Sequence, residues 1–76
     1  MATFETMRAV VNSGSDLIIF RKTTRENVRE LAEIARRTGA TLTVPLSYPS
    51  DFVMELAAEY GKTIRFMHGL PDYQST

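Results

Sequence analysis

The order of apolar patterns along the chain limits the possible fold more than any other feature. Residues 16–22 contain the consecutive apolar run Leu-Ile-Ile-Phe, which is typical of a strand with both faces covered. Segments 41–46 and 63–68 alternate apolar and polar residues, as strands with one covered face do. Two stretches with helical spacing separate the three strands: one follows residues 23–26 and runs to about 38, and the other is opened by residues 47–51 and stopped by Gly61. The core of the chain therefore reads β-α-β-α-β.

Capping signals fix where the two connecting helices begin and end. Thr23 and Glu26 have the spacing of a capping box, so Thr23 is expected to cap the first connecting helix. Gly39 is expected to end that helix in the left-handed conformation. Pro49 near the first turn and Gly61 after the last turn bracket the second connecting helix.

The segment before the first strand has two interpretations. Residues 3–11 place apolar side chains on one helical face, with Thr3 as the cap. The turn residues 12–15 also allow a hairpin, in which 5–11 and 17–22 would be its arms. The apolar positions do not alternate, which favours a helix.

The predicted class is α/β, with a small three-stranded and mostly parallel sheet. The wholly apolar strand is expected in the centre, because Pro45 lacks a donor and should confine its own strand to an edge. This gives strand order 2-1-3, with helices on both faces and an extra N-terminal helix. The alternative order is 1-2-3, with both connecting helices on one face. Residues 1–70 are expected to form one domain, and 71–76 a loose polar tail.

Composition excludes several classes of protein. The chain has 76 residues, no cysteine and a formal net charge of zero. It therefore carries no disulfide, thiolate zinc site or cysteine nucleophile, and a reducing, cytoplasmic setting is expected. The run of four apolar residues is far shorter than a membrane helix requires, so no membrane partner is expected. A net charge of zero also argues against a dedicated binder of duplex DNA.

One candidate site is an anion site at the carboxyl ends of the strands. In the expected order 2-1-3, ligands would bind where the strand order switches, between the first and third strands. The residues that converge there, and could hold a phosphate or carboxylate at a helix N-terminus, are Lys22, Thr23, Thr24, Arg25 and His68. The plainer interpretation is a helix cap beside solvated cations and an exposed histidine.

Catalysis has little support in the sequence. His68 is the one histidine, and no triad, metal-ligand spacing or glycine-rich phosphate loop accompanies it. We therefore expect no cofactor, no metal and no enzyme, with a small enzyme that uses His68 as a remote alternative.

A second candidate site is a surface for self-association. Met54 and Ala58 widen the apolar surface of the second connecting helix, and Arg65 and Met67 occupy the outer positions of a strand without proline. These four residues are the expected interface of a homodimer. The predicted function is a small binding or assembly module that acts through protein–protein contacts. The alternative is an accessory protein that binds an anion, a phosphate or a nucleic acid.

Overall fold

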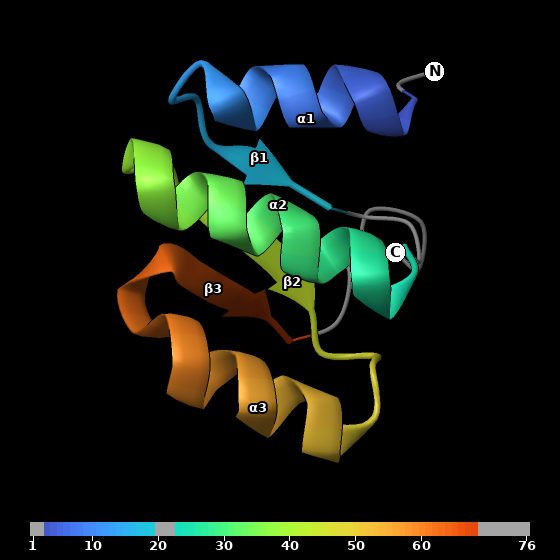
Figure 1. The fold of residues 1–76 in the computed structure, drawn as a ribbon. Coiled ribbons are helices and arrows are strands. Elements are labelled where there is room, and N and C mark those ends of the chain that lie inside the picture. The colour runs from blue at the N-terminus through green and yellow to red at the C-terminus, as the bar shows by residue number, and fades with distance from the viewer. Residues whose placement is uncertain (1–2, 20–22, 69–76) are drawn as a thin grey trace, which may run out of the picture.

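The computed structural model describes residues 3–19 and 23–68. The described elements, in chain order, are α1 (Phe4–Asn12), β1 (Leu17–Ile18), α2 (Arg25–Thr38), β2 (Leu42–Pro45), α3 (Ser50–Tyr60), the short 3-10 helix η1 (Gly61–Thr63) and β3 (Ile64–Met67). The expected βαβαβ order with a preceding α-helix is therefore confirmed (Figure 1). The expected tail at 71–76 lies outside the described residues.

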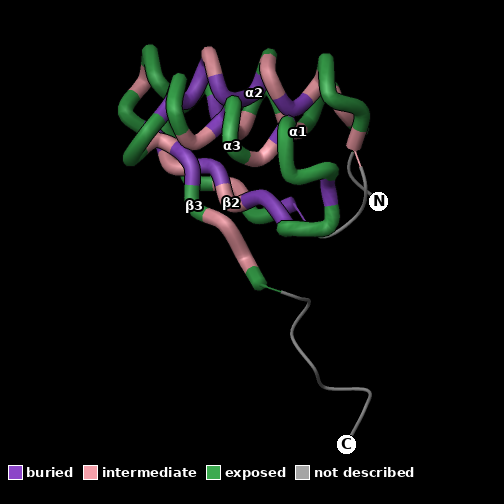
Figure 2. Tube along the Cα trace, turned by 90° about the horizontal axis from the view of Figure 1, so that it is seen from below, coloured by how far each residue is buried: buried purple, intermediate pink, exposed green. Residues whose placement is uncertain are grey.

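The three strands form a parallel sheet in the order β1-β2-β3. The predicted order 2-1-3 is wrong, and the alternative order is the one observed. Two right-handed crossovers that step in the same direction place both connecting helices on one face of the sheet. Figure 2 shows α1, α2 and α3 together on that face, with the strands beneath them. The structure therefore has two layers, and not the expected helices on both faces.

Pro45 does not force β2 to the edge of the sheet, because of its position in the strand. Odd-numbered residues of β2 direct their backbone groups toward β1: the N–H of Ile19 donates to the carbonyl of Thr43 at 2.9 Å. Even-numbered residues face β3, as the 3.0 Å bond from Leu46 N to Met67 O shows. The missing donor of Pro45 thus points to the side on which β1 has already ended at Ile18. Proline ends one ladder here and leaves the other intact.

The apolar run that was expected to be covered on both faces is covered on one. Leu17 packs against the core and Ile19 is buried, but Ile18 between them is 55% exposed. Alternation along the strand directs Ile18 to the face opposite the helices. Among the described residues, no element lies on that face (Figure 2).

The ends of the helices follow the expected chemistry with one shift. Thr3 caps α1, which confirms the helix against the hairpin. The cap of α2 is Thr24 and not Thr23: its hydroxyl oxygen accepts a hydrogen bond from the N–H of Asn27. Gly39 ends α2 with φ of 81°, in the left-handed region that glycine tolerates best.

The core lies between the helices and the inner face of the sheet. Its largest fully buried side chains are Phe52, Leu31, Leu42, Leu56, Val11, Val28 and Val44. Charged groups join the helices above this layer: the guanidinium of Arg29 on α2 pairs with Glu55 and Glu59 on α3. The same guanidinium lies 5.4 Å from the centre of the Phe52 ring, so polar and apolar contacts hold α2 and α3 together.

Candidate functional site

A pocket lies where β1 and β2 end and where α2 and α3 begin. It has a volume of about 470 Å³ and is lined by Thr23, Thr24, Arg25, Tyr48 and Pro49. Parallel strands deliver their carboxyl ends and the following helix N-termini to one edge of the sheet, so this placement follows from the topology. The structure thus brings together three of the predicted anion-site residues.

The remaining two predicted anion-site residues do not join this pocket. Lys22 lies outside the described residues. His68 is exposed directly after β3 and is not part of the pocket lining. The expected meeting of the first and third strands does not occur, because β2 lies between them.

Tyr48 is the residue of this pocket that sequence reasoning missed. It is 5% exposed, and its hydroxyl donates to the carbonyl of Thr23 at 2.5 Å and accepts from the N–H of Thr23 at 2.8 Å. Its ring also meets Phe52 edge-on, with centroids 5.5 Å apart. An aromatic residue with a hydroxyl, placed just after a strand, was the available signal. Tyr48 ties the loop after β2 to the loop after β1.

Several polar groups of the pocket already have structural partners. The hydroxyl of Thr24 caps α2, and the guanidinium of Arg25 lies 5.2 Å from the centre of the Phe52 ring. Stacking leaves the charge and the donors of Arg25 in place. Among the residues that the structure describes, the pocket therefore offers the cation of Arg25 beside the N-terminus of α2.

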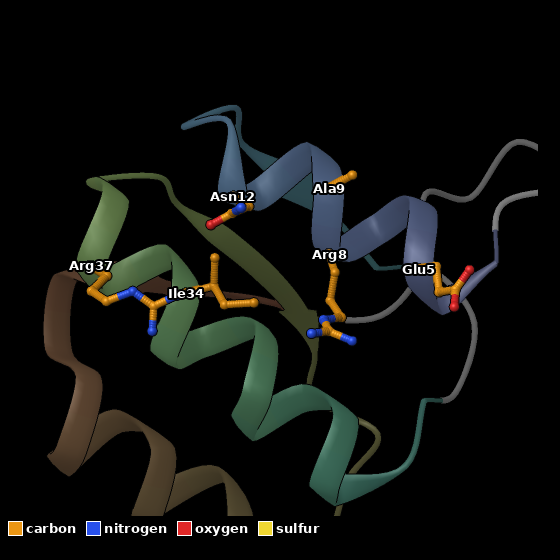
Figure 3. A pocket seen from close by; sticks show the side chains of 6 residues that line it. All are labelled: Glu5, Arg8, Ala9, Asn12, Ile34 and Arg37. Carbon is orange, nitrogen blue, oxygen red and sulfur yellow. The ribbon is translucent and has the colours of Figure 1, made fainter.

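A second hollow lies between α1 and α2 (Figure 3). It has a volume of about 370 Å³, and its lining consists of Glu5, Arg8, Ala9, Asn12, Ile34 and Arg37. Arg8 extends from α1 toward α2, where its Nε lies 3.0 Å from a carboxylate oxygen of Glu30. The lining mixes both signs of charge, and one of its two arginines is already paired. The lining itself holds two arginines against one glutamate, but Glu30 pairs with Arg8, so the charges around this helix contact balance.

The uncovered face of the sheet carries a row of three side chains across the strands. Ile18, Thr43 and Arg65 are register partners on β1, β2 and β3. One step further along, Met67 is the register partner of Pro45. Predicted interface residues Arg65 and Met67 therefore lie on this bare face.

The other two predicted interface residues lie elsewhere. Met54 is 66% exposed and Ala58 is also exposed. Both lie on the side of α3 opposite its buried residues Phe52, Leu56 and Tyr60. The four predicted residues therefore belong to two separate surfaces and do not form one patch.

Asp16 adds an anion at the edge of the bare face, and sequence reasoning missed it as well. It directly precedes β1, it is exposed, and by alternation it shares the side of Ile18. Its Oδ1 accepts a hydrogen bond of 2.8 Å from the N–H of Thr41, which aligns β1 with β2. Arg65 is the one charged residue within the three described strands.

The perturbed pKa values belong to the contact between α2 and α3, away from the pocket and the bare face. Burial, followed by the hydrogen bond that its hydroxyl donates to Glu33, raises the pKa of Tyr60 to about 12. The hydrogen bonds from Arg36 and Tyr60 lower the pKa of Glu33 below its ordinary value. Tyr60 on α3 bonds Glu33 on α2, and Arg36 bonds the same carboxylate, so these pKa shifts reflect contacts that hold the two helices together.

Comparison with protein families, curated proteins and solved structures gave no match to this chain. Within residues 3–19 and 23–68, no group of three or more metal-ligating side chains lies close enough to hold an ion. In the same described ranges, no helix has the length and apolar character to cross a membrane.

Proposed function

We propose that this chain is a small non-catalytic assembly module that self-associates through the bare face of its parallel sheet. The observation that carries the proposal is the single-sided covering of that sheet. Parallel sheets occur almost only with both faces covered, because crossover connections and packing partners bury them. Here all three described α-helices cover one face, and the other carries the exposed Ile18 and the half-buried Met67.

The energy available from covering this face supports an assembly. Ile18 leaves 55% of its surface in water, and full burial of an isoleucine is worth about 1.5–3 kcal/mol. Burying the rest of Ile18 in each of two copies thus contributes about 2–3 kcal/mol, before the contribution of Met67. The gain matters in a chain of 76 residues, whose own core supplies about 3–5 kcal/mol.

Matched lysine substitutions test the proposal. Ile18→Lys places a charge on the bare face, whereas Met54→Lys places one on α3 at an apolar position that is at least as exposed. Mass measured by light scattering after size exclusion should fall toward 8.6 kDa for Ile18→Lys and stay at that of the native protein for Met54→Lys. The opposite result would move the interface to α3, and no change in either variant would contradict the proposal.

A second candidate function is the binding of a small anion in the pocket after β1 and β2. The observation in its favour is the position of Arg25 and two threonines at the N-terminus of α2, in a hollow of about 470 Å³. A phosphate group, free or in a nucleic acid, has the matching chemistry. Titration with inorganic phosphate and with a short oligonucleotide at low salt tests it, with NMR shifts as the readout. Arg25→Gln should abolish the shifts and Arg65→Gln should preserve them, whereas equal loss in both variants would indicate unspecific charge attraction.

A further inference from the structure

The charges at the two edges of the bare face indicate how a second copy would sit on it. This inference rests on the proposed self-association and adds its geometry. We infer that two copies pack sheet against sheet around a two-fold axis that runs along β2, so that Asp16 of each copy faces Arg65 of the other. The product would be a four-layer assembly, with the helices outside and the two sheets in the middle.

Two symmetric arrangements can cover the face, and they differ in which strands meet. An axis along β2 places β1 of one copy over β3 of the other. An axis across the strands places each strand over its own copy. In the second arrangement β3 lies over its own copy, so an axis that crosses the strands at the level of Arg65 would bring Arg65 against Arg65 at one edge of the contact, where the like charges repel.

The axis along β2 removes this repulsion. Neighbouring strands are about 4.8 Å apart, so β1 and β3 are separated by roughly 10 Å, and the two copies of Arg65 lie at opposite edges of the contact. Each Arg65 then meets Ile18 of the other copy, against which its aliphatic stem can pack.

The same axis brings Asp16 within reach of the guanidinium. Asp16 lies beside Thr41, which is two residues before Thr43, the register partner of Arg65. The offset along the strand is therefore roughly 7 Å and packed sheets are about 10 Å apart, so the two Cα atoms lie about 12 Å apart, a distance that an arginine and an aspartate side chain can bridge together. The bond from Thr41 N occupies Oδ1 of Asp16, and its second carboxylate oxygen can accept from Arg65 of the other copy.

Charge reversal tests this geometry in the full chain. Asp16→Lys and Arg65→Glu each create two repulsive pairs across the proposed contact, whereas the double variant restores two attractive ones with reversed signs. We expect each single reversal to raise the dimer dissociation constant by about tenfold or more, and the double variant to return to within about threefold of the native value. Sedimentation equilibrium gives these constants directly.

A conservative variant separates association from folding. Asp16→Asn keeps a side-chain oxygen that can accept from Thr41 N but loses the charge, so it should weaken the dimer while circular dichroism stays unchanged. If the double variant does not regain affinity and Asp16→Asn does not weaken the dimer, the inferred axis is wrong. The proposed self-association would still stand in that case. A native protein that sediments as a monomer would overturn the proposed self-association and this geometry with it.

Discussion

Tyr48→Phe should cost this protein a large share of its stability through the loss of one oxygen atom. The Tyr48 hydroxyl makes two hydrogen bonds to the backbone of Thr23, at 2.5 and 2.8 Å. One such bond is worth about 0.5–1.5 kcal/mol net, and its loss leaves partly buried backbone groups less well paired. The change should therefore lower the free energy of unfolding by about 2 kcal/mol, and the ring contact with Phe52 should persist.

Urea unfolding followed by circular dichroism measures this effect, at one fixed protein concentration because association shifts the midpoint. With a denaturant slope of about 1 kcal/mol per molar urea, the midpoint should fall by about 2 M. Tyr60→Phe is the control, since the hydroxyl of Tyr60 makes a single 3.0 Å bond to the exposed carboxylate of Glu33. A loss below about 0.5 kcal/mol for Tyr48→Phe would refute the idea that its hydroxyl holds the loops after β1 and β2 together.

Three further changes follow from the described contacts. Gly39→Ala has open space for its Cβ but keeps φ of 81°, so thermal denaturation should show a loss of about 1 kcal/mol from backbone strain alone. Val28→Ala empties a fully buried position, and chemical denaturation should show a loss of about 2 kcal/mol. The raised pKa of Tyr60 means that the folded state holds this proton more tightly than the unfolded chain. Its contribution should therefore be complete below pH 10.0 and lost as the pH rises toward about 12. Unfolding measured against pH should show this loss in the native protein and not in Tyr60→Phe.

The sequence predicted the elements well because each has a local cause. Helix α2 is capped by Thr24 at its start and by Gly39 at its end, and these signals act within a few residues. The cap is Thr24 and not Thr23: two adjacent threonines offer the same hydroxyl chemistry, and Tyr48 hydrogen-bonds the backbone N–H and carbonyl of Thr23, so the helix begins one residue later.

The sheet order could not be predicted from the same local signals. Pro45 was expected to exclude its strand from the centre, but the effect of a proline depends on which neighbour its missing donor faces and where that neighbour ends. The apolar run was expected to be covered on both sides, yet the direction of two crossovers decides which face the helices cover. Both facts concern long-range arrangement, which is why Ile18 is exposed despite its apolar neighbours.

The residues of the candidate site could be predicted where they depend on local features, and not where they depend on contacts between distant segments. Thr24 and Arg25 were identified because a helix N-terminus is a local feature, whereas Tyr48 is 25 residues from its partner Thr23 in the chain. Arg65 was identified from its strand position, and its relation to Asp16 needed the register of all three strands.

Sedimentation equilibrium of the native protein across micromolar concentrations tests the central claim most directly. The account predicts a mass that rises with concentration from 8.6 kDa toward twice that value, with no larger species. A mass of 8.6 kDa at every concentration would contradict the claim that the bare face of this parallel sheet is covered by a second copy.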